Sequence, residues 1–204
     1  QKSFDQYFPV VNDKRNLFYS IYNLESSHPI ERMQILQKAK IAGNDFVDDL
    51  YNLSMISKPL TEKNFSKDRL LVSNIAGEIE KAKLDCSFLL NVPVDSSKMI
   101  YSSLSEILKN LGFNVTNSES NCFYILNAVV DYNRQDEDDL IVMNPSLLIE
   151  IMYNGKTFYV YSADFDKKIS YNLSKIEKNV CKEIKEKIEL EFQNDFCKNV
   201  GLEK

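Results

Sequence analysis

The stretch from Lys83 to Val115 constrains the fold most strongly, because its hydrophobic period changes from that of a strand to that of a helix. From Leu84 to Val94 every even position is apolar, which predicts a β-strand with one face in the core. From Ser97 to Leu111 the apolar residues recur at the spacing of one helical face. They are Ile100, Leu104, Ile107, Leu108 and Leu111.

Residues with known preferences for helix ends flank this second segment. Asp95 or Ser96 can cap the start of the helix by accepting hydrogen bonds from backbone N–H groups. Gly112 allows the left-handed backbone at the end of the helix, and Phe113 then begins another strand. The whole stretch therefore predicts a strand–helix–strand unit.

The chain after this unit predicts further strands. Cys122 to Tyr132 is apolar on both faces, as in a central strand. Asn154-Gly155 separates two alternating segments and favours a type I′ hairpin turn. Pairing across that turn sets Ile151 opposite Phe158 and Ile149 opposite Val160 on the core face. The other face then carries a mixed set, namely Leu148, Glu150, Met152, Tyr159 and Tyr161.

Two segments complete the second half. The run from Asn133 to Asp139 is the most charged in the chain and predicts an exposed, mobile loop. Asn172 or Ser174 begins a last helix that runs to about Asn199. Its apolar residues follow a steady step of four, which winds around an α-helix because one turn holds 3.6 residues. They are Ile176, Val180, Ile184, Ile188, Phe192 and Phe196.

The first half is mainly helical by the same criteria. Gln1 to Val11 contains Pro9 and is predicted to be an extended arm. Helices are expected from Asp13 to Leu24, from Pro29 to Met55 and from Ser66 to Lys83, with a loop at Ser57 to Asn64. A strand at Arg69 to Ile75 is the alternative to the third helix. The second helix has a heptad-like stripe suited to antiparallel helix packing. Its members are Leu36, Ala39, Gly43, Phe46, Leu50 and Leu53.

Together these elements predict an α+β protein. A helical N-terminal region, residues 1–83, packs beside a mixed β-sheet in residues 84–204 that two helices cover on one face. The element order of the second part is β-α-β-β-β-hairpin-α. The two parts form either two domains or one continuous domain.

The composition disfavours several classes of function. The net charge of −5 argues against a protein that binds chiefly the phosphate backbone of nucleic acids. No apolar run reaches the 18 residues of a membrane-spanning helix. Four cysteines without a CxxC pair and a single histidine disfavour a zinc site, and the acids Asp45, Asp48 and Asp49 are more simply a solvated helix face than a metal site. We expect no cofactor and no metal.

The cysteines leave one question open. Cys86 and Cys122 both fall in predicted strands, so they are either buried thiols or, in an oxidising compartment, a disulfide. Gln1 in place of Met fits a mature chain after signal-peptide cleavage, with or without a lipid anchor, and equally a shortened chain.

One part of the pattern resembles a known group of proteins. It consists of Leu104, Leu108 and Leu111-Gly112-Phe113-Asn114-Val115, an apolar strand at Cys122 to Val130, a hairpin at Leu147 to Tyr161 and a final amphipathic helix. This order resembles the α/β domain of bacterial envelope lipoproteins, of the penicillin-binding-protein activator and curli-secretion types. The resemblance implies a non-enzymatic, periplasmic or membrane-anchored module that contacts another envelope protein.

Three functional hypotheses follow. The first is an envelope interaction or scaffold protein, whose candidate partner surface is Met152, Tyr159 and Tyr161, unless these residues are ordinary core. The second is a sheet that stacks single-stranded nucleic acid on Tyr124, Tyr159 and Tyr161. The third is an enzyme that uses carboxylates such as Asp131, Asp164 and Asp166. A cytoplasmic location is the alternative to the periplasm, and the partner and oligomeric state stay open.

Overall fold

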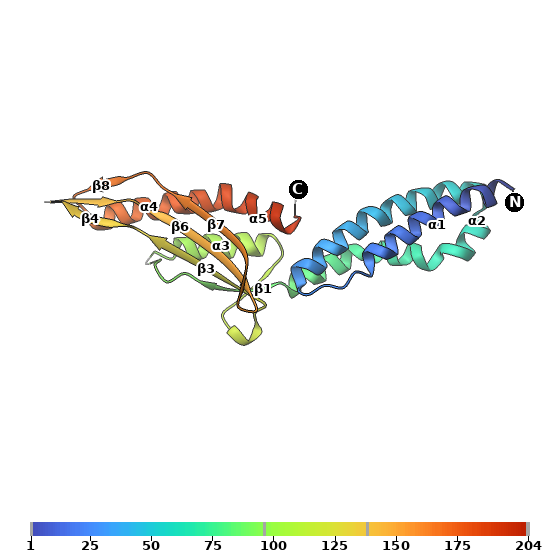
Figure 1. The fold of residues 1–204 in the computed structure, drawn as a ribbon, viewed down its shortest axis with the longest axis horizontal. Helices are drawn as coiled ribbons and strands as arrows, with labels where there is room; N and C mark the ends of the chain where they lie inside the picture. The colour runs from blue at the N-terminus through green and yellow to red at the C-terminus, as the bar shows by residue number, and fades with distance from the viewer. Residues whose placement is uncertain (1, 96, 138, 203–204) are drawn as a thin grey trace. The chain divides into compact units, whose positions relative to one another are not determined.

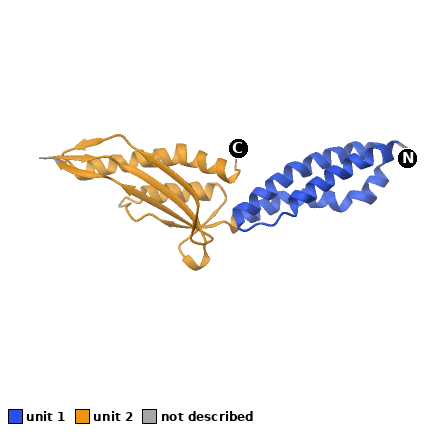
Figure 2. Ribbon diagram, viewed as in Figure 1, with its two compact units in different colours: residues 1–83 blue, residues 84–204 orange. Residues whose placement is uncertain are grey.

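The structure of the chain, a computed structural model, describes residues 2–95, 97–137 and 139–202. The chain divides into two compact units, residues 1–83 and residues 84–204 (Figure 2). The first unit is helical, and the second combines helices with a mixed β-sheet. The predicted α+β class is therefore confirmed.

Two helices build the first unit. Helix α1 spans Lys2–Tyr22 and helix α2 spans Pro29–Asp85. Ser57 interrupts α2 with an extended backbone, φ −156° and ψ 94°, so that α2 consists of two helical segments. The stripe predicted for the first segment is buried throughout, because it faces the other helices. Its buried members are Leu36, Ala39, Gly43, Phe46, Leu50 and Leu53.

The extended arm predicted at the N-terminus is wrong, because α1 begins at Lys2 and continues through Pro9. A proline inside a helix removes one backbone hydrogen bond and is costly. Packing offsets this cost here, since Phe4 and Val11 on either side of the proline are buried. The ring of Phe8 also lies 5.4 Å from the ring of Phe65 in α2, measured between centroids.

The loop predicted at Ser57 to Asn64 is also wrong, because only Ser57 leaves the helical conformation. Pro59 then falls in the first turn of the second helical segment, where its missing N–H would have had no partner. The Thr61 hydroxyl donates a hydrogen bond of 2.9 Å to the carbonyl oxygen of Ser57. The proline therefore starts a helix here instead of marking a loop.

The second unit contains a five-stranded sheet with the strand order β2-β1-β3-β6-β7. The three strands β2, β1 and β3 run parallel to one another, and β6 and β7 form an antiparallel hairpin beside β3. The predicted central strand is therefore central. The strands are β1 (Ser87–Asn91), β2 (Asn114–Thr116), β3 (Tyr124–Asp131), β6 (Ser146–Tyr153) and β7 (Lys156–Asp164).

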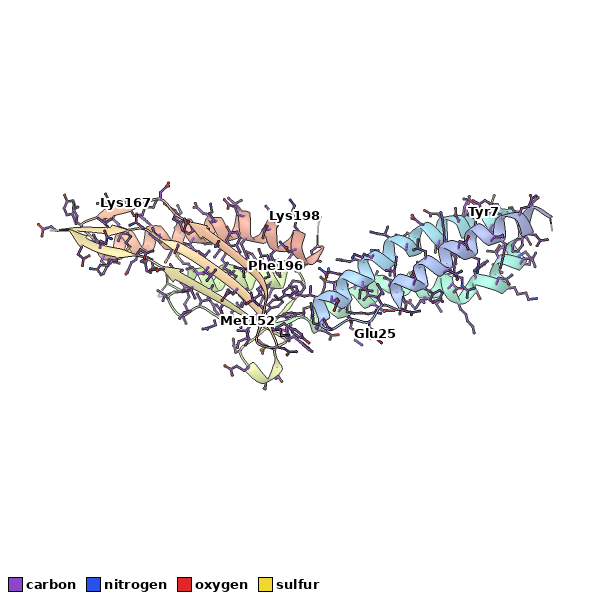
Figure 3. All side chains as sticks on the ribbon, viewed as in Figure 1. Tyr7, Glu25, Met152, Lys167, Phe196 and Lys198 are labelled. Atoms are coloured by element: carbon purple, nitrogen blue, oxygen red, sulfur yellow. The ribbon has the colours of Figure 1, made fainter. Side chains whose placement is uncertain are left out.

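Helices cover one face of this sheet (Figure 1). They are α3 (Met99–Asn110) and a continuous C-terminal helix made of α4 (Leu173–Lys187), a π-helical turn η2 (Ile188–Phe192) and α5 (Gln193–Val200). Phe196 of α5 lies against the sheet (Figure 3), with its ring centroid 6.4 Å from that of Phe88. The sheet and helices thus form two layers with an aromatic core.

The ends of the strand–helix–strand unit follow the sequence closely. Gly112 has φ 89°, and the N–H of Phe113 donates to the carbonyl of Leu108 at 3.0 Å. The Asp95 carboxylate accepts a hydrogen bond of 2.8 Å from the N–H of Tyr101, whereas Ser96 lies outside the described residues. The first strand is shorter than predicted, because α2 continues to Asp85.

The loop predicted at Asn133 to Asp139 is wrong, because most of it is strand. Strand β4 (Arg134–Glu137) pairs with β5 (Leu140–Met143), and β5 pairs with β8 (Lys168–Ser170) in a separate three-stranded sheet. A short 3-10 turn, η1 (Glu119–Asn121), precedes β3. Charged residues are tolerated in β4 because it is an edge strand of this small sheet.

All six residues of the ridge predicted for the last helix are buried, although a step of four should carry them around the helix. The π-helical turn η2 accounts for this, because a π turn holds more residues than an α turn. The π turn rotates the following residues back towards the sheet, so that Phe192 and Phe196 lie on the same side of the helix as the earlier members. The stacked rings of these two residues lie 5.7 Å apart. The long helix can therefore keep one face on the sheet.

Candidate interaction surface

The hairpin that forms the outer part of the sheet has the predicted turn. Asn154 and Gly155 have φ of 49° and 72°, the left-handed values that a type I′ turn requires. Tyr153 pairs with Lys156, as predicted.

The pairing beyond the turn differs from the prediction by one residue of β7. A β-bulge lies at Ile151/Met152, and beyond it Ile151 pairs with Tyr159 where the sequence predicted Phe158. In the same way Ile149 pairs with Tyr161 and not with Val160. Because side chains alternate between faces, a shift of one residue exchanges the two faces of β7. The face predicted from the sequence is therefore wrong for this strand.

Tyr159 and Tyr161 consequently lie on the face that the helices cover. Tyr159 is 8% exposed, and its hydroxyl donates a hydrogen bond of 2.5 Å to a carboxylate oxygen of Asp195. The Tyr161 hydroxyl donates to Glu191 at 3.4 Å. Burial and the nearby carboxylates raise the pKa of both phenols, that of Tyr161 to about 12. Both side chains join β7 to the C-terminal helix.

Met152 lies on the opposite face of the sheet, which we call the open face. It pairs with Ile125 of β3, and Ile125 pairs with Leu89 of β1, so three apolar side chains form one row across three strands. The structure therefore does not bring Met152, Tyr159 and Tyr161 together on one surface.

The open face carries several large apolar side chains that are in contact with solvent. Val129 and Leu148 face each other across β3 and β6 and are 44% and 38% exposed. Val160 on β7 is 50% exposed, and Phe123, immediately before β3, is 49% exposed. Grouped exposed apolar side chains of this kind are typical of contact surfaces.

A polar row crosses the open face between these apolar residues. The side-chain amide of Asn91 donates to the Asn127 side chain at 3.1 Å, and Asn127 donates to the Met152 sulfur at 3.3 Å. Asn127 also pairs across the strands with Glu150. These contacts hold the amides in place, so the surface offers oriented polar groups flanked by apolar ones.

Sequence reasoning missed Val129, Leu148 and Val160 as a group. The signal was present in part, because the central strand is apolar on both faces and only one face can lie against the helices. The face on which Val160 lies depends on the bulge, and no residue pattern in the sequence indicates that bulge.

The structure also places the residues of the two alternative hypotheses. Tyr124 is 0% exposed, so it is not free to stack on a base, and the stacking prediction is wrong for this residue. Asp131 and Asp164 pair with Ser146 from either side and so lie in one row, two strands apart. Both are exposed, as is Asp166.

In the part of the chain that the structure describes, no group of three or more His, Cys, Asp or Glu side chains is placed to hold a metal. Asp49, one of the helix-face acids, forms an ion pair of 2.7 Å with Lys14.

None of the cysteines forms a disulfide; Cys86 is buried and Cys122 is half-buried. No helix among the described residues combines the length and apolarity needed to cross a bilayer.

No protein-family model matches the chain, and no curated protein matches its sequence. Several solved structures are similar to it, among them two bacterial lipoproteins. A minor lipoprotein from Acinetobacter baumannii matches with a TM-score of 0.33 and 12% identity, over 52% of this chain and 92% of that one. The lipoprotein GNA1162 from Neisseria meningitidis matches with a TM-score of 0.28 and 15% identity, over 48% of this chain and 97% of that one.

Proposed function

We propose that this chain is a non-enzymatic interaction module of the bacterial cell envelope that binds a partner protein through the open face of its sheet. The observation that carries the proposal is the group of exposed apolar side chains on that face, including Val129, Leu148 and Val160. The helices that cover the other face already bury the core of the unit, so these side chains are not needed to close it.

The composition of the open face fits a protein partner. Its rows of apolar side chains would be desolvated in a contact, while the Asn91–Asn127 row offers hydrogen bonds within it. The aromatic rings proposed for stacking on bases point to the helices, which favours a protein over a nucleic acid. The envelope location rests on the element order set out in the sequence analysis.

Site-specific crosslinking in source cells tests the contact. A photo-crosslinking amino acid at position 129 or 148 is expected to capture the same partner, and the substitution Leu148→Glu should remove the capture from position 129. The matched control is position 171, because Tyr171 is also exposed, at 77%, but lies outside the five-stranded sheet. Capture from position 171 alone, or from none, would contradict the proposal.

Thiol labelling tests the compartment. In spheroplasts, a membrane-impermeant maleimide should label Cys122 and Cys197, which are half-buried, before the cells are lysed. Cys86 serves as the internal control, because burial raises the pKa of its thiol to about 12 and so keeps it unreactive. Labelling that requires lysis of the inner membrane would favour the cytoplasmic alternative.

A further inference from the structure

Strand β7 is the last strand of the five-stranded sheet, and its outer edge is long. Among the described residues no strand pairs with that side of Lys156–Asp164. Native proteins usually blunt such an edge with proline, with charges along the strand, with a β-bulge or by keeping it short. Here the nine residues include no proline, and the charged ones, Lys156 and Asp164, stand only at the two ends. The bulge at Phe158 lies near one end, so the residues from Tyr159 to Asp164 form a regular edge.

A groove of about 500 Å³ runs beside this edge, between β7 and the C-terminal helix. Val160, Tyr161 and Ser162 line it from the strand. The helix contributes Leu190, Glu191, Asn194, Asp195 and Lys198. Leu190 is 68% exposed and Val160 is 50% exposed, so apolar surface is available on both walls. The edge therefore offers backbone hydrogen-bonding groups beside a mainly polar groove, in which Val160 and Leu190 supply apolar surface.

The charges along this edge are complementary to themselves. One end of β7 carries Lys156, and the other end carries Asp164. A second β7 in antiparallel orientation, centred on Val160, overlaps the full strand and sets each basic end beside an acidic end. Because of the bulge in β7, Lys156 of one copy pairs with Ala163 of the second copy and not with Asp164. Lys156 still lies next to Asp164, which follows Ala163 in the chain.

The helix side of the groove carries charges of both signs. Contacts with Tyr161 place Glu191, which also pairs with Lys187 at 3.0 Å, nearer the Asp164 end, and contacts with Tyr159 place Asp195 and then Lys198 nearer the Lys156 end. A two-fold axis through Val160 turns the Lys198 end of one groove towards the Glu191 end of the other. The opposite charges at the two ends of β7 therefore favour a second copy over an arbitrary extended peptide.

We infer that the occupant of this edge is a second copy of the chain, with the two β7 strands paired antiparallel around Val160 to form one continuous ten-stranded sheet. Such an interface is isologous, because the same patch is used by both copies. It leaves the open face uncovered and joins the two open faces into one surface. The inference uses the backbone edge of β7, whereas the proposed partner contact uses side chains of the open face. Val160 belongs to both, so the crosslinking from positions 129 and 148 tests the partner contact and the charge reversals at Lys156 and Asp164 test the dimer.

Sedimentation of the full chain over a concentration series tests the inference. The chain is expected to form a dimer, and Lys156→Glu should raise its dissociation constant about tenfold, because two exposed ion pairs become like-charge contacts. Asp164→Lys should have a similar effect. The double variant K156E/D164K should return the dissociation constant to within about threefold of the original.

Two further variants separate a paired edge from a general charge effect. Val160→Lys sets two ammonium groups opposite each other at the centre and should abolish the dimer, while its exposed position spares the fold. Lys178→Glu, at an exposed site on α4, should change nothing. A chain that stays monomeric at all concentrations would overturn the inference. So would a dimer that tolerates Val160→Lys, or single charge reversals that the double variant does not rescue.

Discussion

The two units hold their layers together in different ways. In the helical unit the contacts between helices include buried polar ones: Asp68, 3% exposed, accepts hydrogen bonds from Arg15 at 3.0 Å and from the Tyr19 hydroxyl at 2.7 Å. Tyr22 in α1 similarly donates to Glu78 in α2 at 2.9 Å. These contacts tie α1 to the second segment of α2 at two levels along the helices.

In the α/β unit the contact between sheet and helices is mainly aromatic. The rings of Phe88 and Tyr124 on the sheet stack at 5.0 Å, and Phe196 meets Phe88 and Tyr159 edge-on. The polar contacts, such as that between Tyr159 and Asp195, lie at the margin of this cluster.

The difference follows from what sets the register in each unit. The apolar stripe of the helical unit is heptad-like and repeats, so two such helices can shift by one repeat at a small cost in free energy. Specific polar contacts then distinguish one register from the next. A sheet is held in register by its backbone ladder and by the alternation of its side chains. Its contact with the helices can therefore be apolar and still unique. Substitutions in each unit test the two sides of this comparison. Hydrogen exchange of the full chain reports on both units separately, and thermal or denaturant unfolding measures the smaller effects.

The largest effect is expected in the aromatic core. Phe196→Ala should lower the free energy of unfolding of the α/β unit by about 3–5 kcal/mol, through lost burial and the cavity left behind. Exchange should accelerate in peptides from residues 84–204 and stay unchanged in residues 1–83. Tyr171→Ala is the control, because that ring is 77% exposed and its loss should cost about 0.5 kcal/mol or less. Equal acceleration in both units would mean that they unfold together.

The next effect concerns the polar contact of the helical unit. Asp68→Ala should destabilise residues 1–83 by about 1.5–3 kcal/mol, because it removes two hydrogen bonds to a buried carboxylate. Glu62→Ala removes the carboxylate of an exposed ion pair with Lys58 and should cost about 0.5 kcal/mol or less. If Asp68→Ala proves neutral, the apolar stripe alone defines the packing of the helices.

A smaller effect distinguishes two glycines of α2. A Cβ at Gly43 would lie 3.0 Å from a methyl group of Val72, so Gly43→Ala should destabilise the unit by about 1 kcal/mol after the gain in helix propensity. A Cβ at Gly77 meets nothing within 4 Å, and Gly77→Ala should stabilise it by about 0.5–1 kcal/mol. Thermal unfolding of both variants should show shifts of opposite sign. Shifts of the same sign would show that helix propensity outweighs the close approach.

The smallest effect comes from the ionisation of two tyrosine hydroxyls, which changes stability only at alkaline pH. Burial and hydrogen bonds to carboxylates raise the pKa of Tyr159 and Tyr161 in the folded chain above the unfolded value of about 10. The folded state then binds more protons than the unfolded state above pH 10, so stability falls as pH rises from there.

Tyr159→Phe provides the control for this pH dependence. It removes one titrating group, so the loss of stability of the α/β unit between pH 10 and pH 12 should become shallower. Denaturant midpoints measured across that range would show it. An unchanged slope would assign the alkaline loss to other groups.

Several features were predictable because their causes are local. The helical faces of α3 and of the C-terminal helix follow from the spacing of apolar residues along the chain. The end of α3 at Gly112 and the turn at Asn154-Gly155 follow from backbone conformations that few residues adopt. The amide of Asn172 caps α4 as expected, by accepting a hydrogen bond of 3.0 Å from the N–H of Lys175.

Three predictions failed because packing, a single change of backbone conformation or strand pairing outweighed the expected signal. Pro9 lies within a helix since the residues around it are buried against α2. Pro59 starts a helical segment since a single extended residue, Ser57, precedes it. The acidic run at Arg134–Glu137 is a strand since β5 lies beside it and supplies its backbone hydrogen bonds.

The sequence by itself determined which segments are helix and which are strand, wherever the hydrophobic period and the turn residues agree. These segments in turn determined the α+β class. Only the tertiary structure decided which side of β7 faces the helices, because the bulge at Ile151/Met152 arises from the pairing of two strands and shifts every later residue to the other face. That shift buries Tyr159 and places Val160 on the open face. The physical reason is that a strand's side-chain pattern has a period of two, so one extra residue exchanges its inside and outside.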